Sequence, residues 1–209
     1  MRLDTENERT GLKTRHYNGP GSATISLMIP DEHSEAPIVA ANPFTADDVI
    51  AILRERGWLA GEASTEQRSW CERAASMLGG HAADRAALAE LLGLVFQYDA
   101  YEIISKVESH VVLSRYAARG VTRQVALLLL DGAALTSERF KEIVTALKDG
   151  MELRGRELFH PIRLALAGRA GEGELDRVIL LLDEAAAVSF AVTVKSARER
   201  IIEFCSALD

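Results

Sequence analysis

From residue 44 onward, hydrophobic positions recur at the three- and four-residue spacings of amphipathic helices. The clearest stripe has the spacing i, i+3, i+4, i+7, i+8 and consists of Leu88, Leu91, Leu92, Val95 and Phe96. Such a stripe turns one apolar face toward a core. Comparable stripes occur at 104–111, 140–147, 175–182 and 194–208. Almost nothing alternates with the two-residue period of a strand, so we expect an all-α fold of roughly eight helices.

Several helix ends can be predicted from capping residues. Thr45 followed three residues later by Asp48 has the form of a capping box, and Ser64 with Gln67 repeats it. In this pattern, each side chain accepts from a backbone N–H group that the first helical turn leaves unpaired. A longer helix is predicted from about residue 100 to 118, with Ile104, Val107 and Val111 facing inward.

The first 43 residues differ in composition from the rest. They contain four of the five prolines and the turn sequence Asn-Gly-Pro-Gly at 18–21. We interpret 1–43 as an extended arm with one short strand at 23–29. We divide the remainder into helical subdomains at 44–130 and 131–209, with a break near Gly120 or between 130 and 136.

Composition excludes several classes of protein. The chain has 209 residues, of which 48% are hydrophobic and 26% charged, as in ordinary soluble proteins. No apolar run approaches the roughly 20 residues of a membrane span, and no signal-peptide pattern begins the chain. With two cysteines and no His/Cys ligand spacing, we expect neither a disulfide framework nor a metal site, and we expect a cytoplasmic protein without cofactors.

No catalytic residues are predicted. The five histidines are scattered, and neither a Gly-x-Ser-x-Gly elbow nor a phosphate-binding glycine loop is present. The carboxylates fall on polar helix faces, where solvation explains them. An enzymatic function is therefore not indicated.

The arginines are more informative than the acids. The net charge of −7 argues against a general nucleic-acid coat protein, but it leaves room for a local basic face. No acidic residue occurs between 109 and 130, while Arg115, Arg119 and Arg123 recur every four residues. A second cluster lies within 154–169. Arginine offers a fork of donors to phosphate oxygens, although pairing with acids on other helices would also explain both clusters.

The segment 154–169, Arg-Gly-Arg-Glu-Leu-Phe-His-Pro-Ile-Arg-Leu-Ala-Leu-Ala-Gly-Arg, is the most specific motif. It resembles the C-terminal anticodon-binding region of bacterial glutamyl-tRNA synthetases, which carries Leu-Phe-x-Pro-x-Arg-x-Ala-Leu-Thr-Gly. The resemblance covers about 44–209 and is clearest at 136–182. The residues that match the motif are Leu158, Phe159, Pro161, Arg163, Ala165, Leu166 and Gly168. The departures are Ala167 for Thr, Glu172-Gly173 for Gly-Pro, and Asp183 for Gly.

The resemblance implies an anticodon-binding fold without the catalytic half. Neither a His-x-Gly-His nor a Lys-Met-Ser-Lys-Ser type motif is present, so we expect no aminoacylation. Within the motif, Pro161 suits the first turn of a helix, and Gly168 can end that helix in a left-handed conformation. We expect Arg163 to bond carbonyls or acids inside the domain rather than RNA.

Two functions are compatible with these features. The first is a stand-alone tRNA-binding module, for tRNA-Glu in particular, that assists a synthetase or another tRNA-dependent enzyme. The predicted RNA-binding residues are Arg115, Arg119, Arg123, Arg154, Arg156, Arg169, Lys195 and Arg198. The second is a protein-interaction module or homodimer that has lost RNA binding, which the net charge and the apolar residues 25–29 favour. The chain as a piece of a longer synthetase also remains open.

Overall fold

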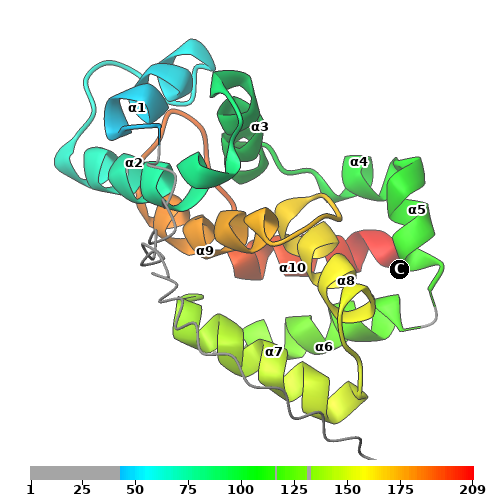
Figure 1. The fold of residues 1–209 in the computed structure, drawn as a ribbon. Helices are drawn as coiled ribbons and strands as arrows, with labels where there is room; N and C mark the ends of the chain where they lie inside the picture. The colour runs from blue at the N-terminus through cyan, green and yellow to red at the C-terminus, as the bar shows by residue number, and fades with distance from the viewer. Residues whose placement is uncertain (1–42, 116, 131–132) are drawn as a thin grey trace, which may run out of the picture. The chain divides into compact units, whose positions relative to one another are not determined.

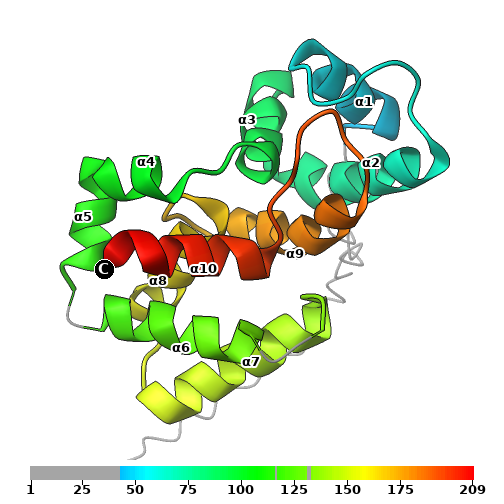
Figure 2. The same ribbon diagram turned by 180° about the vertical axis from the view of Figure 1, so that it is seen from behind.

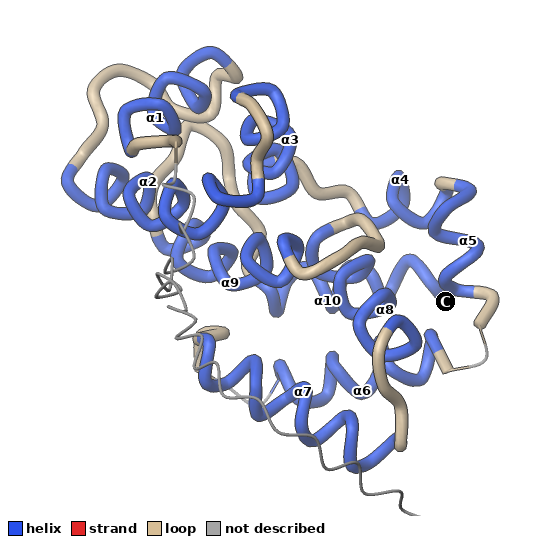
Figure 3. The backbone as a smooth tube through the Cα atoms, in the orientation of Figure 1, coloured by secondary structure: helices blue, strands red, loops and turns tan. Residues whose placement is uncertain are grey.

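Helices form every regular element in residues 43–115, 117–130 and 133–209, the part of the chain that the computed structural model describes (Figures 1 and 3). The predicted all-α fold is confirmed. The elements are α1 (Ala46–Glu55), α2 (Thr65–Leu78), a short 3₁₀ helix (Gly79–His81), α3 (Arg85–Phe96), α4 (Ala100–Ser105), α5 (Val107–Leu113), α6 (Ala118–Leu130), α7 (Ser137–Met151), α8 (Arg156–Ala167), α9 (Glu174–Ala187) and α10 (Ala197–Leu208). The predicted arm, apart from Pro43, and its strand lie outside the described residues.

The predicted capping boxes are confirmed. The Thr45 hydroxyl accepts from the Asp48 N–H, and the Asp48 carboxylate accepts in return from the Thr45 N–H. Ser64 and Gln67 do the same at α2. These local pairs fix where the first two helices begin.

The predicted helix from 100 to 118 is wrong. It is broken at Lys106, whose ψ of 141° is extended, and the Ser109 hydroxyl donates to the Ile103 carbonyl at 2.5 Å across the break. A second interruption follows where α5 ends at Leu113, so Arg115 lies in the bend between α5 and α6. Val107 and Val111, which the sequence predicts to face inward, are 75% and 58% exposed. Gly120 lies inside α6, which packs against α8 and α10. Within the described ranges the α-helices number ten rather than about eight.

The helices pack in two sets (Figures 1 and 2). Helices α1 and α2 pair, and α2 and α3 pack against α9. Four aromatic rings from Trp58, Trp70, Phe96 and Phe190 fill the space between them, with Trp58 stacked on Phe96 at 4.9 Å between centroids. Helices α4, α6 and α8 pack against α10. The division at residue 130 stays a prediction.

The buried side chain of Arg200 joins these sets, and the sequence analysis did not single it out. Its guanidinium donates to the carbonyls of Leu94 and Val95 in the last turn of α3, and to Leu166 in the last turn of α8. Burial lowers the pKa of Arg200 to about 10, so the side chain remains charged at neutral pH. A cation thus satisfies carbonyls at two helix C-termini, where negative partial charge gathers. No helix in the described part is long and apolar enough to cross a membrane.

Candidate nucleic-acid interface

Helix α8 carries the family-like motif and has a glycine at each end. Gly155 precedes it with φ 56° and ψ −137°, and Gly168 ends it with φ 77°, the predicted left-handed conformation. The prediction for Pro161 is wrong, because this residue is the sixth of α8 rather than in its first turn. The helix begins earlier, directly after the turn at Gly155. Because proline has no backbone N–H, Pro161 cannot donate the helical hydrogen bond to the Glu157 carbonyl near the helix start.

Arg163 has the internal role that we expected. Its Nε and Nη2 donate to the two carboxylate oxygens of Asp176 at 2.7 and 2.8 Å, and its Nη1 donates to the Gly171 carbonyl at 2.6 Å. The side chain is only 9% exposed. Its guanidinium also lies 5.0 Å from the centre of the Phe159 ring. The most specific arginine of the motif therefore ties α8 to α9.

Arginines gather at the N-terminal end of α8. Arg154 lies in the preceding loop, Arg156 is the first helical residue, and Arg115 comes from the bend between α5 and α6; all three are exposed. We call these three residues the arginine cluster. Burial lowers the pKa of His160, and the nearby guanidinium groups of Arg115 and Arg156 lower it further. Both arginines therefore approach the same imidazole from different elements.

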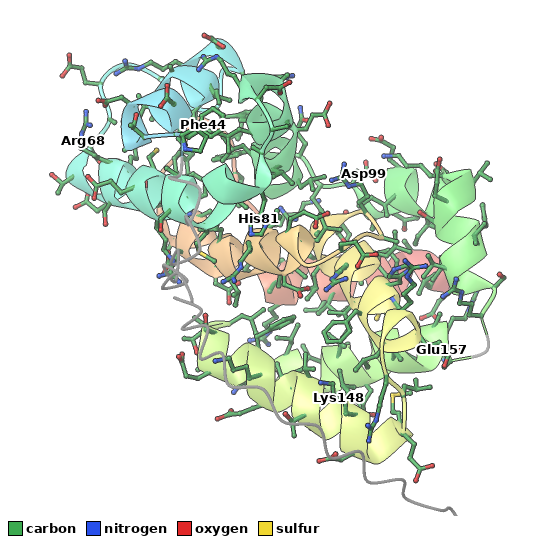
Figure 4. All side chains as sticks on the ribbon, viewed as in Figure 1. Phe44, Arg68, His81, Asp99, Lys148 and Glu157 are labelled. Atoms are coloured by element: carbon green, nitrogen blue, oxygen red, sulfur yellow. The ribbon has the colours of Figure 1, made fainter. Side chains whose placement is uncertain are left out.

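Few acids neutralise this cluster. Arg156 has an ion pair of 3.4 Å with Glu172, in which both side chains are more than 70% exposed. Such an exposed pair contributes little and is easily exchanged. Among the described residues, the side chains of Arg115 and Arg154 have no hydrogen bond or ion pair, and Arg115 bonds only through its backbone. Figure 4 shows the side chains around this end of α8, with Glu157 of α8 and Lys148 of the neighbouring α7 labelled. The cluster can donate to phosphate oxygens.

Arg119 and Arg123 lie elsewhere. Arg119 Nη1 donates to the Leu208 carbonyl at 3.2 Å, and Arg123 pairs with Asp209 at 3.3 Å. Both thus face the C-terminal end of α10. The predicted stripe of three arginines is divided, because Arg115 is not in the same helix.

The other predicted RNA-binding residues are also separated. Arg169 follows Gly168 at the far end of α8, about 18 Å along a twelve-residue helix, where it lines a hollow of about 860 Å³. Lys195 is bound internally, to the Glu203 carboxylate and the Tyr98 carbonyl. Arg198 is exposed at the start of α10, beside a smaller hollow. The structure therefore brings together Arg115 and Arg156, with Arg154 adjacent, and leaves the remaining five apart.

His160 was missed by the sequence reasoning. Its Nε2 is buried and has no hydrogen-bond partner among the residues that the structure describes, and His160 lies four residues after Arg156, on the same face of α8. The four-residue spacing of Arg156 and His160 could have indicated from the sequence that these two side chains are neighbours. The approach of Arg115 to His160 could not have been predicted, because it depends on the bend after α5. Searching the described residues finds no group of three or more His, Cys, Asp or Glu that could hold a metal ion.

Comparison with known families identifies the class of this domain. The family model described as "Anticodon binding domain" matches residues 41–188, which include the arginine cluster and the whole of α8. The chain belongs to this family of anticodon binding domains. The match starts just before α1 and ends just after α9.

Two relatives have names that agree with the resemblance found in the motif. One is a glutamate–tRNA ligase of Bacillus velezensis, 28% identical over 136 residues, which cover 65% of this chain and 28% of the ligase. Another is glutamate–tRNA ligase 2 of Syntrophus aciditrophicus, 30% identical over 86 residues, or 41% of this chain and 16% of that protein. The chain thus spans less than a third of either relative. No solved structure matches. The resemblance to the anticodon-binding region of glutamyl-tRNA synthetases is confirmed.

Proposed function

We propose that this chain binds tRNA at the anticodon arm through the arginine cluster at the start of α8, and that it does not itself aminoacylate tRNA. The observation that carries the proposal is that the match to the anticodon-binding family covers a helix start at which Arg154 and Arg156 are exposed to solvent, with the exposed Arg115 in the bend before α6. Of the candidate species, tRNA-Glu is the first to test, because both relatives are named as glutamate–tRNA ligases.

The cluster suits a phosphate backbone for a physical reason. Arg115 and Arg154 are exposed and hold no acid in the described structure, so contact with phosphate breaks no strong internal pair. The two arginines that the fold needs, Arg163 and Arg200, already have acceptors within the protein. Binding through three phosphate contacts releases counterions, so this part of the affinity falls about 20-fold between 50 and 200 mM salt.

The test is a triple variant, R115Q/R154Q/R156Q, in a filter-binding or mobility-shift titration with tRNA-Glu at several salt concentrations. We expect at least a tenfold weaker affinity at low salt and a shallower dependence on salt. The matched control is R56Q/R68Q/R73Q, which removes three exposed charges from the α1–α2 region and should bind almost as the parent chain does. Equal losses in both variants would reduce the effect to net charge and would reject the cluster.

The alternative function, an interaction module without RNA binding, predicts a different result. In that case, the parent chain does not bind tRNA even at low salt. A charging assay with tRNA-Glu, glutamate and ATP tests the remaining part of the proposal, and glutamyl-tRNA formed by the purified chain alone would refute it.

A further inference from the structure

Helices α6 and α10 lie side by side and run antiparallel (Figure 2). Their alignment is fixed at one end, where Arg123 of α6 pairs with Asp209 just after α10, and Arg119 donates to the Leu208 carbonyl. Positions along the two helices can therefore be compared by counting residues away from the Arg123–Asp209 pair, at about 1.5 Å of rise per residue.

Counting from this pair places apolar residues opposite one another. Leu127 and Cys205 are each four residues away, about 6 Å along their helices, and Leu130 and Ile202 are each seven residues away, about 10.5 Å. The exposed fractions of Leu127, Leu130 and Ile202 are 60%, 41% and 44%, and Cys205 is half-buried. These four residues form one apolar surface, which we call the α6–α10 face.

The α6–α10 face continues into a hollow. Beyond Leu130, a depression of about 480 Å³ is lined by Leu129 and by alanines of the loop before α7 and the end of α9. Its polar side is formed by Asp183, Ser196, Arg198 and Glu199. Isolated exposed leucines are ordinary on protein surfaces, but exposed apolar side chains aligned along two neighbouring helices are a candidate interaction site.

We propose that the α6–α10 face is the contact surface of a homodimer, in which a second copy packs on it about a two-fold axis parallel to the helices. Rotation about this axis places α6 of one copy on α10 of the other. Leu127 then faces Cys205 of the second copy, and Leu130 faces Ile202 of the second copy. A contact of this kind uses the same patch twice.

The charges at the end of the face favour a second copy as the occupant. The same rotation places Arg123 against Asp209 of the second copy, and Asp209 against Arg123 of the second copy. Both side chains are about 70% exposed in the single chain, so each can share its charge with a second partner. Opposite charges therefore meet on both sides of the axis, and the apolar residues meet beside them. This proposal does not depend on tRNA binding.

The first test is the molar mass of the parent chain by light scattering or sedimentation across the micromolar range. We expect a concentration-dependent dimer for the parent chain. L127E and I202E should each raise the dissociation constant at least about 30-fold, since each buries a charge against the apolar strip. The control is V107E, which alters a side chain that is 75% exposed on α5, a helix that is not part of the face. A monomer throughout, or equal effects of V107E and L127E, would overturn the proposal.

A cross-linking experiment tests the face itself. Cys71 is fully buried, so a bis-maleimide should join two chains through Cys205. The cross-linked dimer should form with the parent chain and be lost in L127E and in C205S, with circular dichroism confirming that both variants fold. R123D should weaken the dimer, and R123D/D209R should restore it, because the exchange keeps opposite charges facing each other. Failure of the double variant to recover would reject the proposed axis.

Discussion

The two ends of helix α8 use the same residue type in opposite ways. At the N-terminal end, Arg154 and Arg156 are exposed and Arg115 approaches from another loop. At the C-terminal end, Arg200 is buried and donates to main-chain carbonyls, and the Tyr98 hydroxyl donates to the Ala165 carbonyl. The difference lies in the acceptors: where the fold supplies carbonyls, arginine stabilises the protein, and where it does not, the charge remains available to a ligand.

The largest expected effect comes from removing the buried cation. Arg200→Met leaves carbonyls of α3 and α8 without a donor, which should lower the free energy of unfolding by about 3–5 kcal/mol. Urea denaturation followed by circular dichroism measures the change. Arg156→Gln is the matched control at the other end, and its stability should stay within about 0.5 kcal/mol of the parent chain. Similar losses in both would abolish the distinction between the two ends.

The middle of α8 should respond more weakly than its buried end. Asp176→Asn keeps the shape of the side chain but removes the charge that pairs with Arg163, which is mostly buried. We expect a loss of about 2–3 kcal/mol in the same urea experiment. Asp47→Asn removes the exposed partner of Arg68 and serves as the control, with almost no change expected. A loss below about 1 kcal/mol for Asp176→Asn would show that this pair is not structural.

The terminal glycines allow a matched pair of substitutions. Gly168→Ala places a methyl group 3.0 Å from Ile103 Cδ1 at a φ of 77°, whereas Gly155→Ala has a positive φ of 56° but open space around it. We expect the free energy of unfolding, measured by urea denaturation, to fall by about 2 kcal/mol for Gly168→Ala and by about 1 kcal/mol for Gly155→Ala. The reverse order would mean that backbone strain at Gly155 outweighs contact at Gly168. Gly155→Ala should also weaken tRNA binding, since it alters the turn between Arg154 and Arg156.

The smallest effect concerns pH. Burial and the neighbouring Arg115, Arg156 and Arg163 hold the pKa of His160 below its usual 6.5, against an opposing effect of Glu172. As the pH falls through 6.5, the unfolded chain takes up this proton before the folded chain does, so the free energy of unfolding declines. The decline should be smaller in His160→Gln, compared by urea titrations at pH 7.5 and 5.5. Parallel pH dependences in the two proteins would contradict this assignment.

The sequence by itself determined the local features, because helical periodicity and capping involve neighbours within four residues. The capping pairs at Thr45 and Ser64, the apolar stripe of α3 and the conformation of Gly168 all belong to this group. The family-like motif also identified the fold class, since the spacing of its residues determines which of them face the core when α8 packs.

Only the tertiary structure decided which arginine side chains have acceptors within the protein and which remain available to a ligand. Arg163 has acceptors supplied by α9, and Arg200 has acceptors supplied by the ends of α3 and α8. No local sequence pattern predicts these acceptors. The end of α5 at Leu113 places Arg115 in the bend before α6, where its charge acts on the same His160 as that of Arg156. Charge is a property of the sequence, but its availability depends on acceptors brought near by long-range packing.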